Sequence, residues 1–394
     1  MSLDLTETGA DSALATLCSA TPGVFSEEIW ARRAWLSRAR DLPAQNLFSV
    51  ADVDELLSRR GLRTPFLRMA KDGSVIATNR YTGSGGTGAN IADQVRDEDV
   101  LRLFSQGATI VLQGLHRTWE PVRRLACGLA AELGHPVQVN AYITPAQNQG
   151  FAPHYDTHDV FVLQVSGRKQ WTVHAPVVEL PNRPWDTVAA QVAARATEEP
   201  LIATDLEPGD CLYLPRGFIH SAKALGGTTV HLTFGIHAVT QADVVRAVLD
   251  EILTQDWRAS MPVGWNPLTA DLSTVLAQVG EALASLDQEA VAARLYDARA
   301  AATRPEPVSP VAQAEAAAQL APEDIVRLRT GISARLTATH LHTAIGVSEV
   351  AHADHAALEV LLTGHPVRVQ NLPCDTATIA GLLREGILVI ETPR

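Results

Sequence analysis

Residues 137–144 (VQVNAYIT) alternate apolar and polar side chains without a break. A strand points successive side chains to opposite faces, so this period of two predicts a strand with one buried face. Further strands are predicted at 108–115, 159–173, 211–215 and 228–237, with an amphipathic helix between the first of these and residue 137. Gly, Pro, Asn and Asp punctuate the segments between them. Many short strands joined by turns predict a mainly β core, a sandwich or a barrel.

The segment 159–173 is predicted to be a hairpin that turns at Ser166-Gly167. In its second arm the alternation places Lys169 on the same face as Trp171 and Val173, which is the apolar, inward face. A buried ammonium without a partner is unfavourable and tends to lose its proton. We therefore expect the site to supply an anion, such as the compact carboxylate of a co-substrate. The alternative is that Lys169 extends along the surface to reach solvent.

The β-rich region is flanked by segments of different character. Residues 24–70 are predicted to form short helices, in which apolar residues from Phe25 to Trp35 recur at helical spacing. The Gly-rich segment 82–88 lacks the GK[ST] of a phosphate-binding loop and is interpreted as a mobile loop. Residues 175–205 break the strand rhythm and are expected to leave the sheet.

Beyond His237 the pattern becomes helical. Thr240 with Asp243 resembles a helix-start box, and an amphipathic stripe follows it. A Pro-rich hinge at 303–310 precedes a last segment that mixes helix with short strands. We therefore predict three parts: a catalytic domain with its N-terminal helices at 1–240, a helical segment at 241–305 and a small α+β domain at 311–394. The apolar stripes of the helical segment predict a homodimer, or alternatively packing on the chain's own core.

Composition excludes several classes of protein. The 394 residues carry 44 acids against 32 bases, a net charge of −12, whereas a general nucleic-acid binder needs a basic surface. The sequence contains no run of about 18 apolar residues, so no membrane span is predicted. The first 25 residues do not resemble a secretory signal. The four cysteines lie far apart, which favours a reducing, cytoplasmic setting. Only three of the bases are lysines, namely Lys71, Lys169 and Lys223.

The strongest chemical signal is the segment GFAPHYD, residues 150–156. In an extended chain His154 and Asp156 point to the same side, so an imidazole and a carboxylate converge on one point. These are two of the three ligands of a facial triad, which leaves positions on non-haem Fe(II) open for a co-substrate and O₂. The segment GDCLYLPRGFIH offers His220 just after two bends as the third ligand. A lone HxD is usually a surface turn, but its combination with this second segment favours a metal site.

Other histidines are weaker candidates. His158 lies four residues after His154, but the segment that follows is predicted to be a strand, which does not fit a zinc pair on a helix. His231 shares a face with Thr233 and Gly235 and is interpreted as a hydrogen-bonded structural residue, with a polar-cavity role as the alternative. Asn140 and Tyr142 lie on the less apolar face of their strand and are candidates for further polar contacts.

The strings QGFAPHYD, FVLQVSGRKQW and PGDCLYLPRGFIH closely resemble the JmjC-type cupin oxygenases, and within them the ribosomal oxygenase group. The resemblance is firm over residues 100–237. It implies a double-stranded β-helix core that binds Fe(II) and 2-oxoglutarate. By position, His154, Asp156 and His220 would hold the iron, Lys169 would bind the distal carboxylate of 2-oxoglutarate, and Asn140 and Tyr142 would line the pocket.

The same resemblance, which is weaker beyond residue 237, implies dimerisation helices and a C-terminal winged-helix-like domain. A Ser that some relatives carry on the last core strand corresponds to Gly235 here, so one co-substrate contact is expected to be missing or replaced by water.

Three functions are then open. The first is hydroxylation of an Arg or His side chain of a protein substrate, possibly ribosomal, to which an acidic chain is suited. The second keeps the chemistry and takes a precursor peptide or a small metabolite as substrate. The third is a non-catalytic, metal-binding cupin whose C-terminal part binds DNA as a regulator. Residues 311–394 carry six Arg, no Lys and nine acids, which argues against DNA binding. No nucleic-acid or membrane partner is expected.

Overall fold

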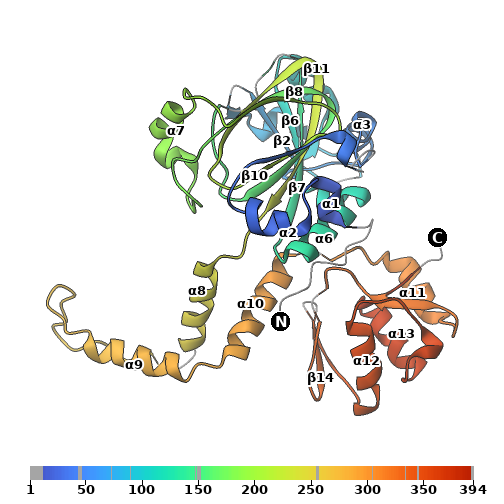
Figure 1. Cartoon of the computed structure of the whole chain (residues 1–394). Coiled ribbons are helices and arrows are strands. Elements are labelled where there is room, and N and C mark those ends of the chain that lie inside the picture. Colours follow the sequence, from blue (N-terminus) through green and yellow to red (C-terminus); the bar gives the residue numbers. More distant parts are fainter. Residues whose placement is uncertain are drawn as a thin grey trace. The chain divides into compact units, whose positions relative to one another are not determined.

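A computed structural model describes residues 12–42, 47–71, 73–88, 90–146, 148, 152–253, 257–303, 305–332, 334–343 and 346–391. The chain divides into two compact units, Met1–Ala238 and Val239–Arg394 (Figure 1). Among the described residues, none of the helices combines the length and the hydropathy that crossing a membrane requires.

The first unit is built on one large antiparallel sheet. Within the described residues its strands follow the order β1-β10-β8-β11-β7-β6-β2-β3, with β9 paired to β8. The strands are β1 (Trp35–Ser37), β2 (Leu67–Lys71), β3 (Ser74–Val75), β6 (Thr109–Leu112), β7 (Val137–Thr144), β8 (Asp159–His174), β9 (Ile202–Leu206), β10 (Cys211–Leu214) and β11 (Ile219–Ile236). The predicted mainly β core is confirmed.

The predicted hairpin at Ser166-Gly167 is wrong, because the chain bends there and continues as one long strand. Both halves of β8 pair with β11, while residues 160–163 also pair with β10 and residues 169–173 with β9. Gly167 has a φ of +66°, and a Cβ there would lie 2.5 Å from the carbonyl oxygen of Thr228. Only glycine therefore fits this bend, which passes β8 from one set of strands to the other.

The alternation read from the sequence matches the observed burial on β7. Val139, Ala141 and Ile143 are buried, whereas Gln138 and Tyr142 are partly exposed. The apolar side joins the main core with helices that cover it. These helices are α1 (Ala13–Leu17), α2 (Pro22–Val24), α3 (Val50–Arg59), α4 (Asp97–Ser105), α5 (Leu115–Thr118) and α6 (Glu120–Leu133).

The predicted helical run from Phe25 to Trp35 ends early. A π-helical turn covers Phe25–Ile29, and Trp35 begins strand β1, where it pairs with Tyr213 of β10. The backbone N–H of Ala31, at a φ of +56°, donates to the Tyr213 hydroxyl at 3.0 Å. This contact with a distant strand turns the chain out of the helix.

Two predicted loops contain short regular segments. Thr82–Gly83 of the Gly-rich segment forms β4, which pairs with β5 (Gln94–Val95). The excursion after β8 holds a 3₁₀ turn (Trp185–Val188) and α7 (Ala189–Arg195), which lies beside the sheet in Figure 1. It ends earlier than predicted, because residues 202–205 already belong to β9.

The second unit begins with three helices, α8 (Gln241–Ile252), α9 (Ser273–Ala284) and α10 (Gln288–Ala302). The predicted helix start is present, since Thr240 caps α8 reciprocally with Asp243. Smaller elements follow: α11 (Pro310–Ala318), α12 (His355–Leu362), α13 (Thr376–Arg384) and two three-stranded sheets. The sheets join β12 (Ile325–Leu328) with β16 (Val367–Arg368) and β17 (Leu388–Ile390), and β13 (Ala334–Leu336) with β14 (His340–Thr343) and β15 (Gly346–Glu349). A separate apolar core holds this part together, and the boundaries at 305 and 311 stay predictions.

Candidate metal centre

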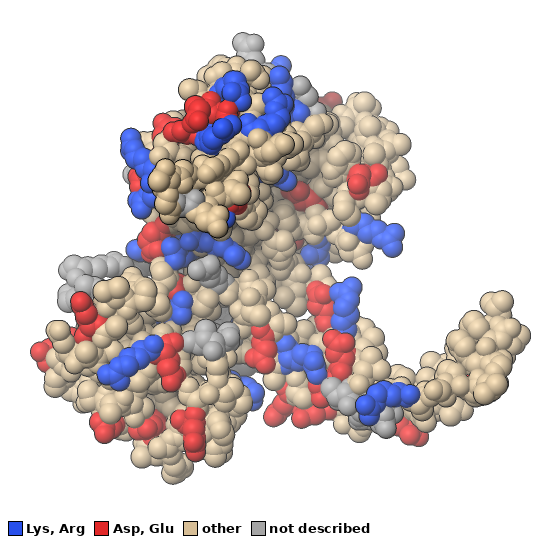
Figure 2. Space-filling view, turned by 180° about the vertical axis from the view of Figure 1, so that it is seen from behind, with Lys and Arg blue, Asp and Glu red and all other residues tan. Residues whose placement is uncertain are grey.

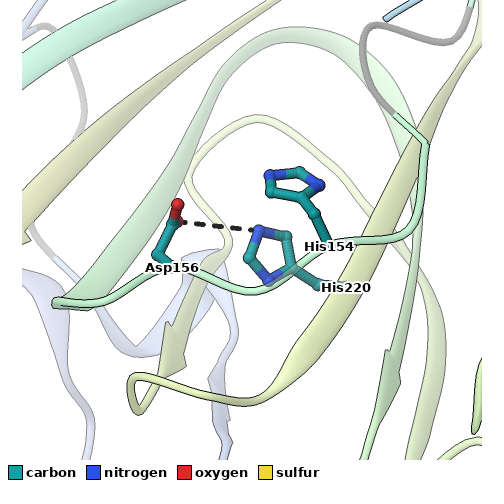
Figure 3. Close-up of side chains that lie close together, drawn as sticks. All are labelled: His154, Asp156 and His220. Atoms are coloured by element: carbon teal, nitrogen blue, oxygen red, sulfur yellow. Dashed lines mark ion pairs between the residues drawn. The ribbon is translucent and has the colours of Figure 1, made fainter. Parts of the chain in front are cut away.

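His154, Asp156 and His220 lie together in the first unit (Figure 3). One potential ligand atom of each side chain lies within 4.8 Å of the others, and the His220 Nε2 is 3.8 Å from an Asp156 carboxylate oxygen. His154 and Asp156 come from the segment before β8, and His220 is the second residue of β11. His220 follows Asp156 by 64 residues in the sequence, yet the three predicted ligands lie side by side in the structure. Gly150 and Phe151 of the same motif lie outside the described residues.

Backbone hydrogen bonds set this geometry. The N–H of His154 donates to the carbonyl of His220 at 3.1 Å, and the N–H of His220 donates to the carbonyl of His154 at 2.8 Å. The N–H of Gly217 donates to the carbonyl of Asp156 at 3.0 Å. Gly217 has a φ of +92°, and a Cβ there would lie 2.8 Å from both Pro181 and the carbonyl of Val178. The turn before β11 therefore requires glycine.

Both imidazoles are oriented by the backbone. The Nδ1 of His154 lies 2.8 Å from the carbonyl oxygen of Ala152, and the Nδ1 of His220 lies 3.0 Å from that of Phe218. A carbonyl only accepts, so each Nδ1 carries the proton and each Nε2 keeps its lone pair. Metal-binding histidines use this arrangement, in which the second ring nitrogen fixes the tautomer.

Burial and the neighbouring His154 lower the pKa of His220 to about 4. Burial acts to raise the pKa of the Asp156 carboxyl, but His220, His158 and His154 outweigh it and hold that pKa below its ordinary value. At neutral pH His220 is therefore a neutral donor and Asp156 an anion. Two imidazole nitrogens and one carboxylate suit a divalent transition metal and leave further coordination positions open.

The three side chains open into a cavity of about 260 Å³. Lys169 also lines it and is only 3% exposed, so the side chain points inward, as its alternation predicts, and does not reach solvent. Its Nζ donates to the Thr144 hydroxyl at 3.2 Å. Within the described part of the chain no carboxylate forms an ion pair with it, and burial lowers its pKa to about 7. Lys169 is therefore a buried amine that shares the cavity with Asp156 but has no described carboxylate paired to it.

The two other predicted pocket residues have different positions. Tyr142 lines the cavity, where burial and the Asp156 carboxylate raise the pKa of its hydroxyl to about 12. Asn140 shares its strand face but is not among the residues that line the cavity. Its side-chain oxygen accepts a hydrogen bond from the N–H of Gly114 at 3.1 Å. A role for Asn140 toward a co-substrate stays a prediction.

Other residues that line the cavity include His231, Arg68 and Trp185. The sequence favoured a structural role for His231, with a polar-cavity role as the alternative; in the structure it lines the cavity and contacts Lys169. Arg68 lies on β2, a strand that the helical reading of residues 24–70 missed. Trp185 comes from the excursion after β8, and its ring centroid is 6.5 Å from that of His154. No periodicity indicated it.

His158 does not line the cavity; its ring contacts that of His237, with centroids 5.2 Å apart. It also lies against Gly235, where a Cβ would be 3.2 Å from the His158 Nε2. The space that a side chain at position 235 would occupy is therefore next to the His158 imidazole.

Residues 116–244 match the JmjC domain family. Over 235 residues the chain is 32% identical to human "Ribosomal oxygenase 1", an alignment that covers 58% of this chain and 35% of that one. It is 31% identical over 245 residues to a Culex quinquefasciatus protein named "Bifunctional lysine-specific demethylase and histidyl-hydroxylase NO66", covering 60% of this chain and 36% of that protein. The chain thus spans about a third of the length of these curated relatives.

Among solved structures, that of the Escherichia coli ribosomal oxygenase YcfD matches with a TM-score of 0.59 at 18% sequence identity. The match covers 95% of this chain and 99% of the YcfD chain. A structure of that protein in complex with cobalt and 2-oxoglutarate matches with a TM-score of 0.56 at 16% identity. At these identities the likeness concerns the fold, a jelly-roll core with helical flanks. Residues 116–244 are thus similar to the JmjC domain family, and the chain shares the fold of the YcfD structure.

Proposed function

We propose that this chain is an Fe(II)- and 2-oxoglutarate-dependent dioxygenase that hydroxylates a side chain of a protein substrate. The observation that supports it is one cavity with two unlike features: a His-Asp-His cluster and a buried, unneutralised lysine. A dicarboxylate co-substrate matches both, because one end can reach a metal while the other neutralises the ammonium. The JmjC relatives and the cobalt and 2-oxoglutarate complex of YcfD support the same assignment.

His154, Asp156 and His220 would hold the iron through two Nε2 atoms and a carboxylate oxygen. Bound Fe(II) would supply the activation of O₂, coupled to oxidative decarboxylation of 2-oxoglutarate. Within the chain, the carbonyls of Ala152 and Phe218 keep both imidazoles in the tautomer that offers Nε2.

Other residues of the cavity bind and enclose the co-substrate. Lys169 would donate to its distal carboxylate, which would supply the anionic partner that no described carboxylate provides for this ammonium. Val160, Val162 and Trp171 form an apolar wall and are nearly inaccessible to solvent. Such a wall keeps water from the ammonium and so strengthens its attraction for a carboxylate.

The substrate class is proposed from the relatives and from charge. Their names include a ribosomal oxygenase and a histidyl-hydroxylase, so an Arg or His side chain of a basic, ribosomal protein is the proposed target. The net charge of −12 favours association with a basic partner. On the face that Figure 2 presents, acidic and basic side chains are interspersed over the C-terminal part of the molecule.

The test incubates the protein with Fe(II), 2-oxoglutarate and a ribosomal protein extract and follows succinate together with intact-protein mass spectra. We expect one substrate to gain the mass of one oxygen atom, and we expect no gain with Lys169→Met or His220→Ala. Turnover of 2-oxoglutarate that no protein or peptide stimulates would contradict the protein-substrate proposal and favour a small metabolite. Absence of 2-oxoglutarate binding would contradict the oxygenase proposal itself.

We also propose that the chain forms a homodimer through its helical segment, α8–α10. Val245 of α8 and Leu253, which directly follows α8, are 56% and 59% exposed, and Leu276 of α9 is 66% exposed. None of the residues of α9 is buried. Helices with exposed rows of apolar side chains are stabilised when another surface covers them. A second copy of the same segment offers such a surface, because a two-fold dimer uses the same patch on both copies.

A further inference from the structure

The Lys169 ammonium contacts polar atoms of two other strands. Besides the Thr144 hydroxyl of β7, its Nζ lies 3.5 Å from the Nδ1 of His231 on β11. His231 is 4% exposed and Thr144 is fully buried, so these contacts are shielded from solvent. An ammonium has three N–H groups and no lone pair. Two of them are directed at Thr144 and His231, which leaves the third for a bound anion.

The imidazole of His231 is itself held by two aromatic rings. It stacks on Tyr142, its partner across the β11–β7 pair, with centroids 5.0 Å apart and planes 5° from parallel. Trp171 meets it edge to face, with centroids 5.5 Å apart and an angle of 89°. These contacts restrict rotation of the ring and keep its Nδ1 directed at Lys169.

An imidazole nitrogen beside an ammonium can only accept, so Nδ1 carries a lone pair and the proton resides on Nε2. Burial, and then the positive charge of Lys169, lower the pKa of His231 well below its ordinary value, in keeping with a neutral ring. The metal-site histidines have the opposite tautomer, with the proton on Nδ1. The same residue type thus serves the cavity in two tautomers.

We propose that His231 is a positioning residue: its neutral Nδ1 accepts a hydrogen bond from Lys169 and holds the ammonium, charged and oriented, for the distal carboxylate of the co-substrate. This inference rests on the proposed function for the identity of the anion. The pairing of His231 with Lys169 itself is a property of the chain without any ligand. The residue acts through Lys169.

Two substitutions separate this role from simple packing. His231→Phe keeps a flat ring that can stack on Tyr142 but removes the acceptor. His231→Asn loses the ring contacts but keeps an oxygen or nitrogen near the position of Nδ1, and its amide oxygen can accept from Lys169. A packing role predicts that Phe is tolerated and Asn is not, whereas our proposal predicts the reverse.

The first experiment needs no metal or co-substrate. Lysine labelled with ¹³C at Cε gives only three NMR signals, because the chain has three lysines. Lys71 and Lys223 are exposed and serve as internal references. The groups that share the cavity and can affect the titration are Arg68, Tyr142, His154, Asp156, His220 and His231. We expect His231→Phe to lower the transition of Lys169 by about one pH unit, and His231→Asn to leave it near that of the wild type.

The second experiment measures 2-oxoglutarate binding calorimetrically with Mn(II) in place of iron. We expect the affinity to fall about tenfold in His231→Phe and by less than about threefold in His231→Asn, with Mn(II) affinity unchanged in both.

Wild-type affinity for 2-oxoglutarate in His231→Phe, or an unmoved Lys169 transition in that variant, would overturn the proposal. If His231→Phe does not fold, His231→Asn is the test by itself. A large drop in both its Lys169 transition and its 2-oxoglutarate affinity would contradict the proposal. If the wild type binds no 2-oxoglutarate, the proposed function fails, while the lysine titration still decides whether His231 holds Lys169.

Discussion

His154 and His220 exchange two backbone hydrogen bonds, at 2.8 and 3.1 Å, across the isolated bridge that joins the segment before β8 to the start of β11. Their ring centroids are 4.5 Å apart as a result. The two imidazoles are therefore brought together by the backbone and do not depend on a metal for their approach. This makes the site a preorganised one, in which loss of a single ligand should leave the fold intact.

We accordingly expect His220→Ala to abolish 2-oxoglutarate turnover and to weaken metal binding by more than about a hundredfold, with little change in thermal unfolding. A matched control is His365→Ala, because His365 is exposed and belongs to the C-terminal unit. Titration with Mn(II), followed by calorimetry, measures the metal affinity of both. Retention of one tightly bound equivalent by His220→Ala would show that the metal site lies elsewhere.

Binding of 2-oxoglutarate should weaken as the pH rises. Burial lowers the pKa of Lys169 to about 7, so above this pH the empty cavity holds mostly the neutral amine. A carboxylate requires the ammonium, and binding must therefore draw a proton from solvent. We expect the dissociation constant to rise toward tenfold per pH unit above about 7. Calorimetry in two buffers of different ionisation enthalpy should detect uptake of up to one proton at pH 8, and Lys223→Met should behave as the wild type. A pH-independent affinity between 6 and 9 would contradict this assignment.

The same buried ammonium should lower the stability of the empty protein. The pKa of Lys169 falls from 10.5 to about 7 on folding, so the unfolded chain binds more protons between these values. The destabilisation is fully present below pH 7 and disappears as the pH rises toward 10.5. We expect Lys169→Met to raise the free energy of unfolding by about 1–3 kcal/mol at pH 6–7, and by less at pH 9. Chemical denaturation at both pH values measures this, and a destabilised Lys169→Met at pH 6 would be the contrary result.

Parts of this site could be predicted because they depend on local pattern. Alternation along the second half of β8 placed Lys169 inward, and the spacing of His154 and Asp156 placed both side chains on one side of an extended segment. The turn residues before His220 indicated the bend that brings it back. Each of these features is determined within a few residues of chain.

Features that depend on distant partners were missed. Gly167 correctly marked a bend, but whether the chain reverses there or continues is decided by β11, which pairs with both halves of β8. Trp35 fits a helical pattern by spacing, yet it pairs with Tyr213 of β10 in a strand. Arg68 enters the cavity only because β2 lies beside β6 in the sheet. Such pairings are not encoded in local periodicity.

The turn before β11 gives a test of how the backbone positions Asp156. Gly217→Ala should destabilise the protein by about 2–4 kcal/mol, because it adds a close approach to Pro181 and the carbonyl of Val178 to an unfavourable positive φ. Gly226→Ala is the matched control: it has a φ of +74° with nothing within 4 Å of the added Cβ, so we expect about 1 kcal/mol. Urea unfolding compares them, and equal effects would show that the contacts at Gly217 are relieved without strain.

A last prediction concerns assembly. If α8 and α9 meet a second copy through their exposed apolar side chains, a charge in that row should separate the copies. We expect Val245→Asp combined with Leu276→Asp to convert a dimer to a monomer in light scattering, because both residues are more than half exposed and neither is needed for the chain's own core. Glu281→Gln on α9 is a control that changes charge without adding it to an apolar position. The metal site lies in the other unit, so the monomeric variant should still bind Mn(II) with wild-type affinity. A wild-type chain that is monomeric at micromolar concentration would contradict the dimer.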